Sequence, residues 1–210
     1  MMSGFIDLFA SMAIMLPAFL IALTFHEFCH ALAATALGDS TAKRAGRLTL
    51  NPMAHIDPLG MLFLLLFRIG WAKPVPFNQH NFKYPKFYSI LTALAGPCSN
   101  LLLAFVSFTC IKHFPTHLVS DAVALSFLQI LEALAYINVM LGIFNVLPIP
   151  PLDGSHLIIA FLSEKYPAVV LWIHRYALFI LLFVFIFPPT RMLLTSTILT
   201  CAQWLKGLVF

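Results

Sequence analysis

Charge is what this sequence has least of: Asp, Glu, Lys and Arg make up 10% of its 210 residues, against about 25% in a typical soluble domain. Hydrophobic residues make up 61%, and the mean hydropathy is +0.94. The scarcity of charge excludes an ordinary water-soluble domain, and the composition predicts an integral membrane protein. The net charge of +4 is too small, in so apolar a chain, to indicate nucleic-acid binding.

Cysteine is also scarce. The four residues Cys29, Cys98, Cys110 and Cys201 show no CxxC spacing and mostly lie in apolar runs, so we expect buried free thiols. The N-terminus lacks the basic region of a signal peptide, and the first apolar run is too long for its hydrophobic part. We therefore expect no cleavable signal peptide, and a single membrane-embedded domain over residues 1–210.

Long apolar runs dominate the rest of the chain. A helix needs about 20 residues to cross a bilayer, and four runs suit this length: Phe5–Leu37, Ser89–Ile111, Ala122–Leu147 and Val169–Phe187. The run Leu59–Ile69 is shorter and predicts a re-entrant or partial helix, while Met192–Phe210 is either a final short span or an amphipathic helix in the interface. The sequence thus predicts an all-α polytopic membrane protein with about five or six membrane helices, including the re-entrant segment.

The basic residues are unevenly distributed. Seven of the 12 Lys and Arg lie between residues 38 and 87, whereas the loop between the next two spans holds only Lys112. Cytoplasmic loops carry an excess of Lys and Arg, so residues 38–87 are expected to face the cytoplasm. This orientation requires residues 59–69 to enter the membrane and return on the same side. The expected location is the cell membrane, with several passes.

The stretch TFHEFCHALAA, residues 24–34, places three ionisable side chains in the first apolar run. His30 lies about 12 Å inside the helix that ends near Gly38, at about 1.5 Å per residue. Ionisable groups at such depth are costly and normally face a partner or a wet cavity. The alternative to a functional site is a pair of histidines that hydrogen-bond to neighbouring helices, which would leave Glu27 without compensation.

The spacing of these residues favours a metal site. His26 and His30 are four residues apart on one helical face, and HExxH on a helix is a zinc-hydrolase signature. In such a site two neutral imidazoles bind the metal. The adjacent carboxylate, here Glu27, accepts a proton from the attacking water and passes it to the leaving amine.

A catalytic zinc usually takes three protein ligands, and the chain contains only eight Asp and Glu from which to supply the third. Asp153 lies in PPLDG, just after a span that ends on the cytoplasmic side. Such an elbow can re-enter the membrane as a helix with Asp153 on its first turn. Asp before Gly-Ser-His is equally typical of a helix N-cap, so spacing alone leaves both roles open.

Three motifs occur in order: HEFCH, then AGPCSN at residues 95–100, then NVLPIPPLDG at residues 145–154. Together they resemble the site-2 protease family of intramembrane zinc metalloproteases. The loops GDSTAKRAGRLTLNPMAHIDPLG and GWAKPVPFN are similar to those of its compact prokaryotic branch. The resemblance covers roughly residues 20–165. Many relatives carry a PDZ or CBS domain, and no stretch of this sequence has room for one.

The resemblance implies a function and a set of site residues. It implies one Zn2+ ion per chain held by His26, His30 and Asp153, with Glu27 as general base and acid. The partners it implies are the lipid bilayer and membrane-protein substrates with a transmembrane segment, cut within or near that segment in regulated intramembrane proteolysis. The active site would lie nearer the cytoplasmic side.

Several other polar residues have two interpretations. Asn145 could orient a substrate backbone or stabilise an oxyanion, and Asn100 could help to hold either the zinc site or the substrate. Asn138 is expected to form interhelical hydrogen bonds, which remain an alternative for all three amides. His156, close to Asp153, is a candidate to support a metal ligand. Glu132 lies within a span and has no assigned role.

The basic loops have a possible use in substrate binding. The stretches RLTLNP and AKPVPF alternate like strands, which predicts short membrane-associated β-strands in the 40–55 and 70–80 loops. A substrate helix must unwind before its amides can be cut. An exposed strand edge could hold the extended segment by main-chain pairing.

Two other functional classes are alternatives for this sequence: a metal transporter, and a non-catalytic relative that binds metal and membrane helices without cutting them. A transporter has no need for a Glu between the two His and often shows inverted repeats, which are not visible here. The intact HExxH and LDG motifs speak against a non-catalytic relative. A protease is therefore the favoured function.

Overall fold

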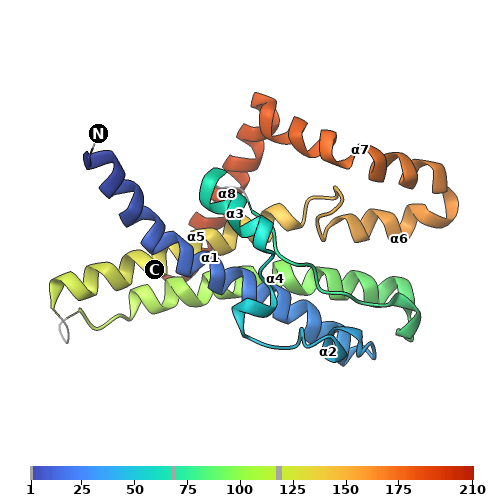
Figure 1. Ribbon diagram of the computed structural model, residues 1–210, viewed down its shortest axis with the longest axis horizontal. Coiled ribbons are helices and arrows are strands. Elements are labelled where there is room, and N and C mark those ends of the chain that lie inside the picture. The colour runs from blue at the N-terminus through green and yellow to red at the C-terminus, as the bar shows by residue number, and fades with distance from the viewer. Residues whose placement is uncertain (1, 68–69, 117–119) are drawn as a thin grey trace.

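A computed structural model describes residues 2–67, 70–116 and 120–210 (Figure 1). Its helices are α1 (Met2–Ala36), α2 (Thr41–Arg44), α3 (Pro58–Phe67), α4 (Pro85–Lys112), α5 (Asp121–Asn145), α6 (Ser155–Lys165), α7 (Pro167–Ile186) and α8 (Pro188–Val209), with 3-10 turns η1 (Pro52–Ala54) and η2 (Gln79–Asn81). The expected all-α architecture is confirmed.

Within the described residues, five helices are long and apolar enough to cross a membrane: residues Met12–Ala36 of α1, and the whole of α4, α5, α7 and α8. This finding agrees with the expected multi-pass membrane protein. The C-terminal segment, for which the sequence allowed two interpretations, forms a 22-residue helix, α8, which meets the length and hydropathy of a span.

The helices α1, α4 and α5 pack most extensively against one another and form the centre of the molecule, and α8 packs against α4 and α5. The buried residues of these contacts are mostly small: Ala18 and Ala22 on α1, Ala104 on α4, Ala135 on α5 and Ala202 on α8. Small side chains let membrane helices approach closely. The α6–α7 hairpin lies to one side, where α7 runs apart from the central helices (Figure 1).

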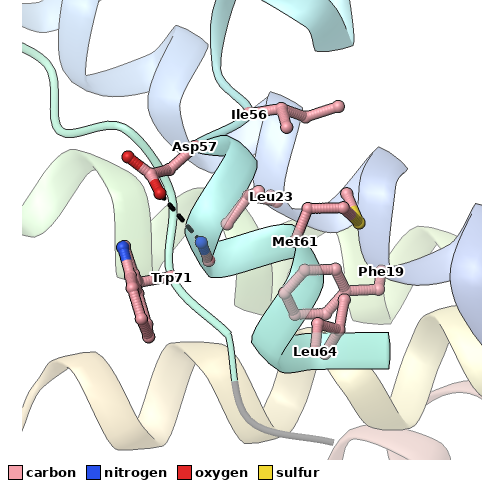
Figure 2. A pocket seen from close by; sticks show the side chains of 8 residues that line it. Phe19, Leu23, Ile56, Asp57, Met61, Leu64 and Trp71 are labelled. Carbon is pink, nitrogen blue, oxygen red and sulfur yellow. Dashed lines mark hydrogen bonds between the residues drawn. The ribbon is translucent and has the colours of Figure 1, made fainter. Parts of the chain in front are cut away.

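The short helix α3 begins with a capped turn. The Asp57 carboxylate accepts a hydrogen bond from the Gly60 amide at 2.8 Å. Figure 2 shows Asp57 beside a small apolar pocket between α1 and α3, which Phe19, Leu23 and Trp71 help to line. Because the carboxylate caps a helix and its surroundings are apolar, this pocket is best explained as packing of α3 onto α1.

The basic loops are less regular than their sequence alternation predicts. Within the described residues, the loops over residues 40–56 and 70–81 contain α2, η1, η2 and one isolated antiparallel bridge between Ile56 and Ala72. The bridge is extended by one hydrogen bond, from the Lys73 amide to the His55 carbonyl at 2.9 Å. The short strands therefore stay a prediction. So does the re-entrant path of residues 59–69, of which residues 68 and 69 lie outside the described part of the chain.

Candidate active site

The two histidines of the HExxH motif face each other from successive turns of α1. Both rings are buried, and their Nε2 atoms lie 2.9 Å apart. The other ring nitrogen of each is used by α4: His26 Nδ1 lies 2.6 Å from Asn100 Oδ1, and His30 Nδ1 lies 2.7 Å from the Thr92 carbonyl. A carbonyl oxygen only accepts, so Nδ1 carries the proton and Nε2 has a free lone pair.

The orientation of Asn100 follows from its own partners. Its amide nitrogen donates to the Ala22 carbonyl at 3.3 Å and to Asn138 Oδ1 at 2.6 Å. Because the Ala22 carbonyl can only accept, the nitrogen must point there and the amide oxygen toward His26. Asn138 in turn donates to the Leu134 carbonyl at 2.8 Å, and both amides are fully buried. This chain of hydrogen bonds links α1, α4 and α5 and fixes the His26 ring.

The elbow between α5 and α6 brings Asp153 to the same point. Its Oδ2 atom lies 3.1 Å from His26 Nε2 and 3.3 Å from His30 Nε2. The Gly154 amide donates to the Asn145 carbonyl at 2.7 Å and closes the elbow. A Cβ at position 154 would overlap the Val146 carbonyl, so only glycine permits this close return of the chain.

These three side chains fit a zinc ion. Asp153 Oδ2 is buried and has no hydrogen-bond partner, and the two Nε2 lone pairs point at the same place. One proton could satisfy one of these contacts, whereas a divalent cation satisfies all three. Ligand atoms around a tetrahedral zinc with bonds of about 2.0–2.1 Å lie about 3.3 Å apart, close to the observed 2.9–3.3 Å.

Glu27 lies directly after His26 on α1, and its side chain is buried. Within the described part of the chain its carboxylate has no hydrogen-bond partner. A carboxylate that is not held by a donor is available to take up a proton, which is the role that its place in the motif predicts.

The other candidates are placed differently. Asn145 is half-buried at the end of α5, where its amide donates to the Leu141 carbonyl at 3.0 Å. His156 lies on the first turn of α6, with its ring centre 5.5 Å from that of Phe77. The two rings border an open hollow of about 540 Å³ next to the elbow, whose other lining residues come mainly from Val75–His80.

Sequence reasoning missed several residues that build the site. Thr92 was missed because it acts through its backbone carbonyl, which has no signature in a sequence. Gly96 lies within the AGPCSN motif, and nothing in the sequence indicates that it faces the two histidines. A Cβ there would lie 2.6 Å from Cε1 of both His26 and His30, so its absence makes room for the rings.

Comparisons with known proteins identify the family of this chain. The model of peptidase family M50 matches residues 110–185. YwhC of Bacillus subtilis, a protein assigned as a zinc metalloprotease, is 37% identical over 171 residues, which are 80% of this chain and 78% of YwhC. The chain belongs to peptidase family M50. The site-2 protease resemblance is therefore confirmed, and the M50 chain is a membrane-embedded zinc metalloprotease rather than a transporter.

Two mycobacterial proteins called Rip2, also assigned as zinc metalloproteases, are further relatives of this M50 chain. The Rip2 of Mycobacterium tuberculosis strain H37Rv is 30% identical over 200 residues, which are 93% of this chain and 71% of that protein. The Rip2 of Mycolicibacterium smegmatis is 32% identical over 148 residues, which are 67% of this chain and 54% of that protein. No solved structure gives a significant match.

Proposed function

We propose that this M50 protease binds one zinc ion per chain through His26 Nε2, His30 Nε2 and the Asp153 carboxylate. In this proposal it cuts membrane proteins within or near their transmembrane segments. The observation that carries the proposal is the convergence of three lone-pair atoms within 2.9–3.3 Å, one of them a buried oxygen without a donor. The single domain would span residues 1–210.

A zinc ion held there supplies Lewis acidity and lowers the pKa of water. Glu27 takes the proton from the attacking water on its carboxylate and delivers it to the nitrogen of the leaving amine. Asn100 and Thr92 hold the His26 and His30 rings so that both Nε2 atoms point at one place. Burial of all these groups keeps competing bulk water away from the reacting bond.

The two asparagines take separate roles in this proposal. Asn100 is fully buried and contacts His26, which favours support of the metal ligand over contact with the substrate. Asn145 is half-buried beside the elbow, and one of its amide hydrogens is already used by Leu141. Its remaining hydrogen and its oxygen are available for a substrate carbonyl or amide, so its role as a substrate or oxyanion ligand stays a prediction.

The proposed orientation puts the active site nearer the cytoplasmic side of the cell membrane. His30 lies six residues before Ala36, where α1 ends, which corresponds to about 9 Å along the helix. The basic loop that follows is the one expected in the cytoplasm. Substrates would then be cut close to the cytoplasmic end of their membrane helices.

The segment after Ala72 is proposed to hold the substrate. Val75 and Phe77 have main-chain groups without hydrogen-bond partners among the described residues. Residues two apart in an extended chain present these groups on the same edge. Pro74 and Pro76 have no amide hydrogen, so the opposite edge cannot form a ladder. An unwound substrate could pair with the free edge as an added strand.

Replacing Val75 and Phe77 by Pro should weaken cleavage, because each change removes an amide donor from this edge. Zinc content, measured by mass spectrometry of the purified protein, should stay at the wild-type level. Val75→Ala and Phe77→Leu keep the amides and serve as controls. Unchanged cleavage by the proline variants would show that the edge does not hold the substrate.

A Glu27→Gln variant tests the proposed function directly. It keeps the side-chain shape but cannot accept the proton, so it should retain zinc and lose peptide hydrolysis by at least about a hundredfold. Proteomics of membrane fragments, comparing wild type with the variant, would identify the substrates that accumulate uncut. Equal fragment patterns in the two strains would contradict proteolysis through Glu27, and a metal transporter would tolerate the change.

A further inference from the structure

Arg47 differs from its basic neighbours. Lys43 and Arg44 are exposed, as charges in a loop usually are, but Arg47 is only 5% exposed. Its guanidinium donates to two consecutive carbonyls, to Pro74 at 3.0 Å and to Lys73 at 2.5 Å. A buried charge is costly unless it is well paired. The burial of Arg47 therefore indicates a role in the fold or in the site.

His55 fixes the position of that guanidinium. The His55 ring is fully buried, and its Nε2 lies 2.8 Å from the Thr49 carbonyl, so Nε2 carries the proton. The free lone pair on Nδ1 then faces Arg47 Nη2 at 3.4 Å. The His55 carbonyl also accepts the Lys73 amide. The Arg47 side chain thus holds the carbonyls of residues 73 and 74, and the His55 main chain holds the amide of residue 73.

The far end of the same segment is also tied to a buried charge. The Asn78 amide donates to the Asp39 carboxylate at 2.6 Å, and the Asn81 side chain donates to it at 2.7 Å. Asp39 is fully buried just after the end of α1. Between these two attachments lie Val75 and Phe77, the residues with free main-chain groups. Each end of the proposed substrate edge is therefore held by an ionised side chain.

The segment lies close to the reacting groups. The Phe77 ring borders His156, which follows Asp153 by three residues on α6. The fixed edge therefore lies beside the elbow that carries Asp153.

We propose that Arg47 is a positioning residue for proteolysis: its grip on the Lys73 and Pro74 carbonyls presents the Val75–Phe77 edge to the substrate beside the metal ligands. The inference rests on the proposed function, because it needs a substrate that pairs with this edge. Among the described residues, Arg47 bonds to Lys73, Pro74 and His55 and to none of the proposed metal ligands. Its loss should therefore weaken substrate binding and leave the chemical step nearly intact.

The test uses Arg47→Lys, which keeps the charge but cannot bond two carbonyls with one planar group. Arg44→Lys is the matched control, since Arg44 is exposed in the same loop. The probe is the membrane-protein substrate identified with Glu27→Gln, carrying a fluorescent label, in detergent micelles. Binding is measured in the inert Glu27→Gln background, and KM and kcat in the active protein.

Arg47→Lys should weaken binding and raise KM by about tenfold, with kcat changed less than about twofold. Zinc content should be unchanged, and hydrogen exchange at the Lys73 amide should be faster. Arg44→Lys should match wild type in every measurement. Wild-type binding and KM in Arg47→Lys would overturn the inference, and so would loss of bound zinc, which would assign Arg47 to the stability of the fold.

The outcomes also separate this inference from the proposed function. Wild-type binding in Arg47→Lys, together with lost cleavage in Glu27→Gln, would leave the protease proposal intact and remove only the role of Arg47. Normal cleavage by Glu27→Gln would instead contradict the proposed function itself.

Discussion

At the scale of single residues, the site depends on a position without a side chain. Gly96 on α4 lies directly against the face of α1 that carries His26 and His30, where a Cβ would come within 2.6 Å of both imidazole rings. The rings cannot retreat, because Asn100 and the Thr92 carbonyl hold them from the side. The glycine therefore sets how closely α4 can support the two histidines.

Replacing Gly96 by Ala should displace the His26 and His30 rings and reduce bound zinc at least about tenfold, as loss of supporting contacts does in other metal sites. The amount of bound zinc is measured by metal analysis after dialysis against a fixed free zinc concentration. Gly207→Ala is the control, because a Cβ at Gly207 meets nothing within 4 Å. Full zinc content in Gly96→Ala would show that the rings can adjust.

At the scale of elements, the end of α1 is joined to the loop before α4 through Asp39. Burial tends to raise the pKa of this carboxyl, but hydrogen bonds from Thr41, Asn81 and Asn78 lower it to about 2. A carboxyl whose pKa falls on folding stabilises the folded state above its unfolded pKa. That contribution is lost as the pH drops through the folded value.

The Asp39→Asn variant should loosen residues 78–81 at neutral pH, because it replaces charge-assisted hydrogen bonds by weaker neutral ones. The effect is measured as the ratio of the amide hydrogen-exchange rates of residues 78–81 in the variant to those in wild type. The ratio should be large above about pH 4 and approach one as the pH falls to about 2. A ratio that does not depend on pH would contradict the role of the Asp39 charge.

Some parts of the candidate site could be predicted from the sequence, and others could not. The pairing of His26 with His30 was predictable because helical periodicity alone puts residues four apart on one face. Asp153 is far away in the chain, and only the family resemblance connected it to them. The burial of Arg47 was not predictable, since a charge in a basic loop normally stays in water. Alternation in the 70–80 loop predicted a strand, but Pro74 and Pro76 have no amide hydrogen. The segment can therefore pair with another strand along one edge only.

At the scale of the whole molecule, the proposed zinc site joins two parts of the chain. His26 and His30 come from α1, while Asp153 comes from the elbow that leads into the α6–α7 hairpin. Within the described residues, α7 makes its substantial contacts with α6 and α8 rather than with the central helices. The hairpin is held at the elbow, by contacts of α6 with α4 and by contacts of α7 with α8.

Removal of zinc by a chelator should abolish cleavage and lower the thermal midpoint of the protein in detergent. Zinc at a hundred times its Kd contributes about 2.7 kcal/mol to the folded state by mass action. Added zinc should restore both properties, and a His26→Ala variant should show no zinc-dependent shift. An unchanged midpoint in the wild type would indicate that the site binds no metal.

The elbow at Gly154 gives the proposed zinc site a second physical effect. By bonding Asp153 to α1, an ion would close most of the chain into a ring, much as a disulfide crosslink does, and so reduce the freedom of the unfolded protein. Cells short of zinc would then hold a protease that is both inactive and less stable, and a less stable fold is more open to degradation.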